Sequence, residues 1–234
     1  MSGGGQLRPG FPQAVNDLQF LTGPSVADLD GVAGQEILEG TASMDLNAFT
    51  AAGSELPGWP KLTTDWTVAN PAVGSLGTLD TAASAHKVVI SETRSGYVNG
   101  YRTGAQACSP SAWPRFHHDN ANSGDYERDA TLPGTPFGAL HTLITITFKA
   151  PGDDLLCGKA KSYEIVTSSR PISPSSFERA KSLPGAPGPR AAGSSQIYTI
   201  PPGAKRYVAI RAVDEAGNVG RPLVVDLGPG FSRR

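Results

Sequence analysis

The feature that most restricts the fold is a motif of proline, glycine, an aromatic residue and proline that occurs twice. Residues 9–12 read PGFP and residues 57–60 read PGWP, and a shorter mark, Trp113-Pro114, follows at a similar distance. The stretches between these marks also resemble each other. The matching segments are 23–29 with 70–76 and 41–49 with 93–101. An internal period of this length indicates that residues 9–114 contain two copies of one small structural unit.

Each copy contains short strand-like runs that end at Gly, Asp or Pro. The expected strands are 25–29, 36–40, 45–49, 72–76, 87–91 and 96–101. The chain has 28 glycines and 20 prolines in 234 residues, which argues against a helical bundle and favours many tight turns. Four short strands in 40 to 50 residues are typical of a propeller blade, and a ring needs about four to eight blades. Two blades therefore cannot close a ring alone.

The first copy resembles a known repeat. The run Pro24-Ser-Val-Ala-Asp-Leu-Asp-Gly31, followed by Gly34-Gln-Glu-Ile37 and Gly40-Thr41, is similar to the FG-GAP or VCBS repeat of integrin-alpha-type β-propellers. The segment Trp113–Asn120 also resembles the last blade of bacterial secreted proteins of this kind. This resemblance implies two blades of an incomplete propeller, further blades upstream, and an extracellular or cell-surface location.

The same resemblance implies a calcium loop with the pattern Asp-x-Asp-x-Asp-Gly and a further acid downstream. Asp28 and Asp30 match the first two positions, Val32 stands where the third Asp would be, and Glu36 follows. Ca²⁺ takes six to eight oxygen ligands, so three acids could share one ion with carbonyls and water. In the second copy only Asp80 remains. The alternative is a β-turn in which the Asp side chains bond backbone amides.

Residues 113–120, called the closing segment below, could form a metal or catalytic site, because His117 and His118 are followed by Asp119. Adjacent histidines on a strand point to opposite faces, however, and rarely bind one ion together. The chain has no nucleophile motif and no patterned acid/base pair. We therefore expect no catalytic residue, and a segment in which Trp113 and Phe116 pack while Asp119 bonds the turning backbone.

The second half has a different pattern. After Asp129 the period stops and alternating apolar residues predict at least five strands. Residues 207–220 resemble the penultimate strand and following turn of a fibronectin type III domain, and Phe148 stands where many members place a buried Trp. A long insertion at 171–189 could contain one or two helical turns.

The predicted fold class is therefore all-β, with two FG-GAP-type blades before a fibronectin type III-like β-sandwich. The expected divisions are a disordered N-terminus 1–8, a propeller part 9–130, a linker 131–137, a sandwich 138–229 and a tail 230–234. The turn acids of the second half, Asp153, Asp154, Asp214 and Glu215, could form a second ion site or remain solvated.

The two cysteines, Cys108 and Cys157, are too few for a disulfide framework and too far apart in sequence for a CxxC site. They could form one disulfide if the chain is exported. The alternative is two unrelated buried thiols.

The charge balance restricts the partners. The formal net charge is −1, which argues against general electrostatic binding to nucleic acid or anionic membrane. The sequence has neither a run of 18 apolar residues nor a signal peptide at its start. We expect a non-catalytic extracellular module for binding, adhesion or spacing, the C-terminal part of a longer protein, with a protein or glycan ligand. The alternative is an accessory C-terminal region of a secreted hydrolase such as a peptidase.

Overall fold

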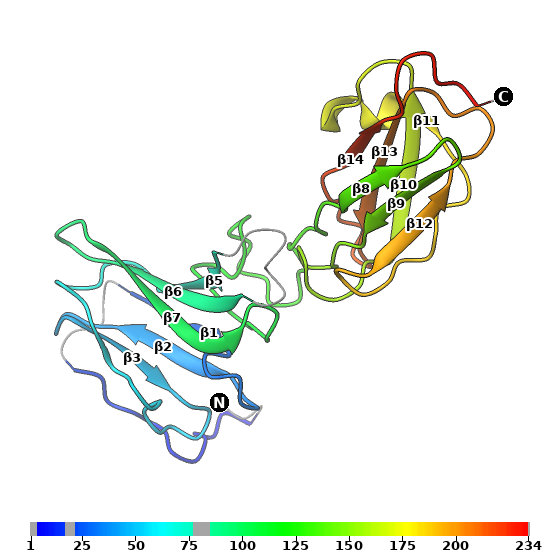
Figure 1. The fold of residues 1–234 in the computed structure, drawn as a ribbon. Coiled ribbons are helices and arrows are strands. Elements are labelled where there is room, and N and C mark those ends of the chain that lie inside the picture. The colour runs from blue at the N-terminus through cyan, green and yellow to red at the C-terminus, as the bar shows by residue number, and fades with distance from the viewer. Residues whose placement is uncertain (1–3, 17–21, 77–84, 234) are drawn as a thin grey trace. The chain divides into compact units, whose positions relative to one another are not determined.

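A computed structural model describes residues 4–16, 22–76 and 85–233 of the chain (Figure 1). Over these residues, 14 strands form four antiparallel sheets, and one short 3₁₀ helix is the only helix. The predicted all-β class is confirmed. The chain divides into two compact units, 1–128 and 129–234, which are described separately below as unit 1 and unit 2.

Unit 1 contains two sheets in which consecutive strands lie side by side. The first sheet has the order β1 (Ser25–Ala27), β2 (Glu36–Gly40), β3 (Asp45–Phe49), β4 (Lys61–Leu62). The second has the order β5 (Ala72–Ser75), β6 (His86–Glu92), β7 (Val98–Gln106). The segment 77–84, which includes Asp80, is outside the described residues.

The β2–β3 and β6–β7 turns, which lie in the two matching copies of the sequence, have the same hydrogen bond. The bonds run from Thr41 N to Asp45 O and from Thr93 N to Tyr97 O, each 3.0 Å long. In each turn, the residue before the one that accepts this bond has a left-handed backbone conformation, with φ of 63° at Met44 and 85° at Gly96. Only the second turn has the glycine that this conformation favours. The same turn geometry therefore follows from two different residues.

The end of unit 1 returns to its first strands. Trp113 and Val26 exchange two backbone hydrogen bonds of 2.9 and 2.8 Å, and Val73 N donates to Pro114 O at 2.8 Å. The segment 110–114 thereby connects the first strands of both sheets. The two sheets share one buried core. Its residues are Ala27, Leu29, Leu38, Leu46, Ala48, Leu56, Val73 and Val89.

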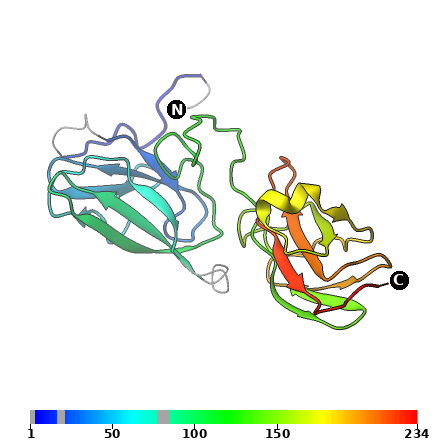
Figure 2. The same ribbon diagram turned by 90° about the horizontal axis from the view of Figure 1, so that it is seen from above.

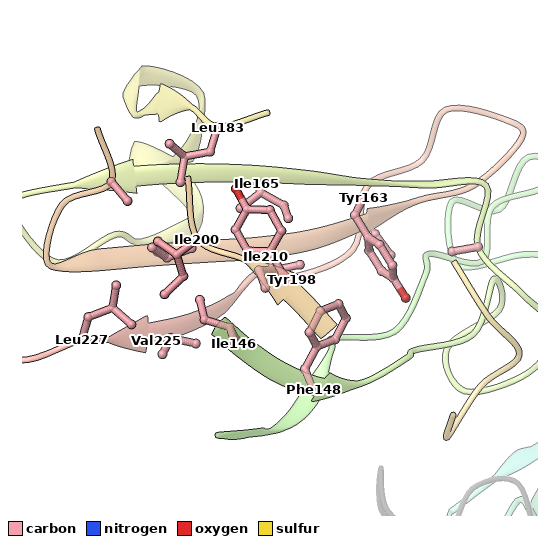
Figure 3. Close-up of a cluster of buried hydrophobic side chains, with 14 residues drawn as sticks. Ile146, Phe148, Tyr163, Ile165, Leu183, Tyr198, Ile200, Ile210, Val225 and Leu227 are labelled. Atoms are coloured by element: carbon pink, nitrogen blue, oxygen red, sulfur yellow. The ribbon is translucent and has the colours of Figure 1, made fainter. Parts of the chain in front are cut away.

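Unit 2 consists of a three-stranded and a four-stranded sheet that face each other. The three-stranded sheet has the order β12 (Ser195–Thr199), β9 (Thr145–Lys149), β8 (Phe137–His141). The four-stranded sheet has the order β11 (Lys181–Ser182), β10 (Ser162–Ser168), β13 (Tyr207–Val213), β14 (Leu223–Asp226). Their inward side chains form one core (Figure 3), in which the rings of Phe148 and Tyr163 meet edge to face at 5.3 Å.

The expected insertion contains the 3₁₀ helix η1 (Pro174–Arg179), which is yellow in Figure 2. The Ser176 hydroxyl accepts a 2.8 Å hydrogen bond from Ser173 N at the start of this helix. Phe177 packs with Val166 and Ala209, on the sheet face opposite the main core. The helix therefore covers part of the outer face of β10 and β13, which explains why Val166 and Ala209 are buried there.

Residues in two of the expected divisions, the linker and the tail, form backbone hydrogen bonds with other segments of unit 2. Within the expected linker 131–137, Leu132 O accepts a 3.0 Å bond from Leu155 N, and Phe137 begins β8. A Cβ on Gly134 would lie 2.0 Å from Leu155 O, so the close pairing of these segments requires glycine. The expected tail is also paired, because Arg233 N donates to Ala204 O at 3.1 Å. The expected disordered N-terminus, 1–8, lies partly outside the described residues.

Candidate functional site

The three acids predicted as calcium ligands lie together in unit 1. Asp28 and Asp30 follow β1, and Glu36 begins β2. One carboxylate oxygen from each lies within 4.8 Å of the others. Asp28 and Glu36 are buried, each 4% exposed, whereas Asp30 faces solvent. We call this group the acidic triad.

Hydrogen bonds from the loop backbone hold the acidic triad in place. The Asp28 carboxylate accepts from Gly31 N at 2.8 Å and from Asp30 N at 3.2 Å. The Asp30 carboxylate accepts from Val32 N at 2.8 Å, and the Glu36 carboxylate accepts from Leu29 N at 2.8 Å. Within the described residues, these bonds use one oxygen of each carboxylate. The β-turn alternative and the ion-binding alternative are therefore compatible, since the same side chains can do both.

A glycine of β7 allows this loop to pack closely against the second sheet. Gly104 N donates to Leu29 O at 2.9 Å, and a Cβ at Gly104 would lie 3.2 Å from Asp30 O. That separation is tighter than an ordinary van der Waals contact. Val32, which replaces the third Asp of the family pattern, is 66% exposed and offers no side-chain oxygen. Further ligands for an ion would have to be backbone carbonyls or water.

A buried lysine adds a positive charge near the acidic triad, and the sequence analysis did not anticipate it. Lys87 is 2% exposed, and its ammonium donates to Pro110 O at 2.6 Å and to the Ser111 hydroxyl at 2.7 Å. Burial lowers the pKa of Lys87 to about 8, although the charges of Asp28 and Glu36 oppose that change. Because Lys87 comes from β6, about 50 residues after the loop, no local pattern indicates it.

The carboxylates also disfavour one another's charge. Burial raises the pKa of Glu36 above its ordinary value, against the opposing bond from Leu29 N, and the charges of Asp30 and Asp28 raise it further. A cation between the three oxygens would offset this repulsion. The arrangement is suited to a hard cation that prefers oxygen ligands, such as Ca²⁺.

No second such group exists among the described His, Cys, Asp and Glu side chains. In the closing segment, the Asp119 carboxylate accepts bonds from Ala121 N at 2.8 Å and Ser123 N at 3.1 Å, so it holds the turn as expected. Phe116 was expected to pack inside the unit, but its side chain is 52% exposed. The local aromatic pattern is the same for a buried and an exposed ring, and so the sequence could not decide this.

The turn acids of unit 2 are partly engaged with one another. Asp214 is fully buried, and its carboxylate accepts bonds from Asn218 N at 2.7 Å and from the Asn218 amide at 2.9 Å. Burial and a hydrogen bond with the Glu215 carboxyl raise the pKa of Asp153 to about 6. A raised carboxyl pKa weakens cation binding, because the proton competes with the cation for the same oxygen.

Both cysteines, Cys108 and Cys157, are disulfide-bonded, and the chain has no others. None of the described helices is long and apolar enough to cross a membrane. Comparison with models of known protein families gives no match, and comparison with curated proteins gives no significant match. Any conclusion about function therefore depends on the geometry described above.

Proposed function

We propose that this protein is a non-catalytic extracellular module for binding or adhesion, part of an FG-GAP repeat protein, and that calcium stabilises its first unit. The observation that carries the proposal is the acidic triad. Asp28, Asp30 and Glu36 occupy the positions that the FG-GAP resemblance assigns to a calcium loop, and their oxygens lie within 4.8 Å of one another.

The arrangement of the strands supports the two family resemblances. In unit 1, each sheet is a meander of consecutive strands, as in a propeller blade. In unit 2, seven strands form two facing antiparallel sheets with β12 beside β9 and β10 beside β13. Such crossing connections between two sheets are typical of the sandwich architecture that fibronectin type III domains share.

Two further observations favour a binding role outside the cell. A disulfide is stable in oxidising compartments and rare in the cytosol, and both cysteines of the chain are disulfide-bonded. A formal net charge of −1 provides no general attraction to nucleic acid. The proposed ligand is a protein or a glycan.

Calorimetric titration with CaCl₂ tests the calcium component. We expect saturable binding with about one ion per chain, at a dissociation constant of about 10⁻⁴ to 10⁻³ M, as for extracellular calcium modules. Asp28→Asn should weaken binding at least tenfold, because it removes a buried carboxylate charge from the site. Asp125→Asn is the matched control, since Asp125 is an exposed acid of the same unit. An absence of binding heat in the parent protein, or equal weakening by both variants, would contradict the proposal.

A further inference from the structure

A second feature of unit 1 is a pocket of ≈ 570 Å³ beside the closing segment, and none of the three acids of the acidic triad lines it. Its walls include four ring-bearing side chains from residues 113–126 and two apolar residues at the start of the first sheet. These are Trp113, Phe116, His117, Tyr126, Pro24 and Val26. We call it the aromatic pocket. Its volume lies within the range typical of ligand sites, about 300 to 1,000 Å³.

The backbone beside the aromatic pocket adopts an unfavourable conformation that presents its rings. His117 and His118 have φ of 52° and 72°, which is costly for residues with a side chain. Backbone hydrogen bonds from His118 N to Arg115 O, at 3.1 Å, and from Gly124 N to His117 O, at 3.0 Å, anchor this turn. As a result, the His117 ring stacks on Phe116 at 3.8 Å, and Phe116 and Tyr126 are 52% and 66% exposed. Exposed rings on a strained, well-anchored turn are typical of a binding surface.

The pocket's lining limits the chemistry of its ligand. None of the described residues that line it is Asp, Glu, Lys or Arg, so it offers no fixed charge to pair with a charged ligand. The backbone of Val26 is already paired with Trp113, and this prevents a partner from adding a strand there. The surface is mainly carbon, which favours a ligand that presents apolar surface to the aromatic rings.

We infer that the aromatic pocket binds a proline-rich segment of a partner polypeptide in the polyproline II conformation. Proline rings are neutral and apolar, and they pack against aromatic faces. A polyproline II chain has no internal hydrogen bonds to lose and little conformational entropy left to pay on docking. The Asn70 amide, at the edge of the pocket, and the Tyr126 hydroxyl are suitable donors for its carbonyl groups. This inference rests on the proposed binding function and names its partner class, but it uses a surface other than the acidic triad.

Calorimetric titration of the full chain with an acetylated octaproline amide tests the inference. We expect saturable binding that Phe116→Ala and Tyr126→Ala each weaken about tenfold, as central aromatic contacts do. Both rings are more than half exposed, so neither variant should alter the tryptophan-monitored melting curve. Tyr97→Ala is the matched control, because Tyr97 is a similarly exposed ring (59%) of the same unit outside the pocket. It should change the affinity less than twofold.

A Gly-Ser octapeptide and cellohexaose serve as competing ligands. Binding of octaproline but of neither competitor supports the inference. No octaproline binding at millimolar concentration, equal weakening by Tyr97→Ala, or selective binding of the sugar overturns it. Asp28→Asn in the same assay separates the two proposals, since that variant should weaken calcium binding and leave peptide affinity unchanged.

Discussion

Replacing Glu36 by Gln should change the stability of unit 1 in opposite directions with and without calcium. Without the ion, the ionised Glu36 carboxylate is buried beside two other carboxylates, and its pKa is raised. A raised carboxyl pKa means that stability falls as pH rises through that pKa. At pH 7.5 in EDTA, the neutral amide should therefore give a melting temperature at least equal to that of the parent protein. The Gln oxygen can still accept the bond from Leu29 N.

With calcium the order should reverse. An ion that binds only the folded state adds RT ln(1 + [L]/Kd), about 1.4 kcal/mol at tenfold and about 2.7 kcal/mol at a hundredfold excess over Kd. The acidic triad should bind Ca²⁺ with a Kd of about 10⁻⁴ to 10⁻³ M. A concentration of 10 mM CaCl₂ is then about a tenfold to a hundredfold excess over Kd. A unit of this size gains about 3 to 4 °C per kcal/mol, so the parent melting temperature should rise by about 4 to 10 °C. Glu36→Gln should gain less than about 2 °C.

Tryptophan fluorescence is the suitable assay, because all three tryptophans, Trp59, Trp66 and Trp113, lie in unit 1. Melting curves in EDTA and in 10 mM CaCl₂ would be compared for the parent protein, Glu36→Gln and the exposed-site control Glu127→Gln. If Glu36→Gln and the parent protein gain the same number of degrees, the carboxylate of Glu36 is not a ligand and the reasoning is refuted.

Two further predictions concern unit 2. Asp153→Asn should leave the free energy of unfolding unchanged near pH 4, where the Asp153 carboxyl is protonated. Because the pKa of Asp153 is raised to about 6, the parent protein loses stability between about pH 4 and 6. At pH 7.5 the variant should therefore be more stable than the parent by about 1 kcal/mol, after allowance for solvent screening. Urea unfolding at the two pH values measures this, and an equal effect at both would contradict it. Phe148→Ala should lower the free energy of unfolding by about 3 to 5 kcal/mol, since the ring is 2% exposed. The control Ile197→Ala, at a 62% exposed position of the same sheet, should lower it by less than about 0.5 kcal/mol. Similar losses in the two variants would show that this core is not the one described.

Local sequence patterns predict strands well where turn residues limit both ends. The expected strands 36–40 and 45–49 coincide with β2 and β3, because Gly40 and the turn that Thr41 begins separate them. The prediction 96–101 is less accurate, since β7 extends from Val98 to Gln106. Its length depends on pairing with β6 across a register shift, and a local pattern contains no information about that partner.

The same distinction applies to the candidate site. The spacing of Asp28, Asp30 and Glu36 along the loop indicates the acidic triad, because a short loop can bring alternating side chains together. Lys87 and Gly104 come from strands of the other sheet, so their approach to the triad depends on the tertiary fold. Likewise, the exposure of Phe116 depends on the anchored turn that follows it.

The pairing of Trp113 with Val26 also determines when unit 1 can become complete during synthesis. These partners are 87 residues apart in the sequence, and non-local pairing of this kind is slow to form. Until the segment 110–114 leaves the ribosome, β1 can pair with β2 on one side only, and its other edge remains open. An open strand edge is a template for pairing with another chain. Nascent chains stalled before residue 110 should therefore associate with one another more readily than chains released after residue 128.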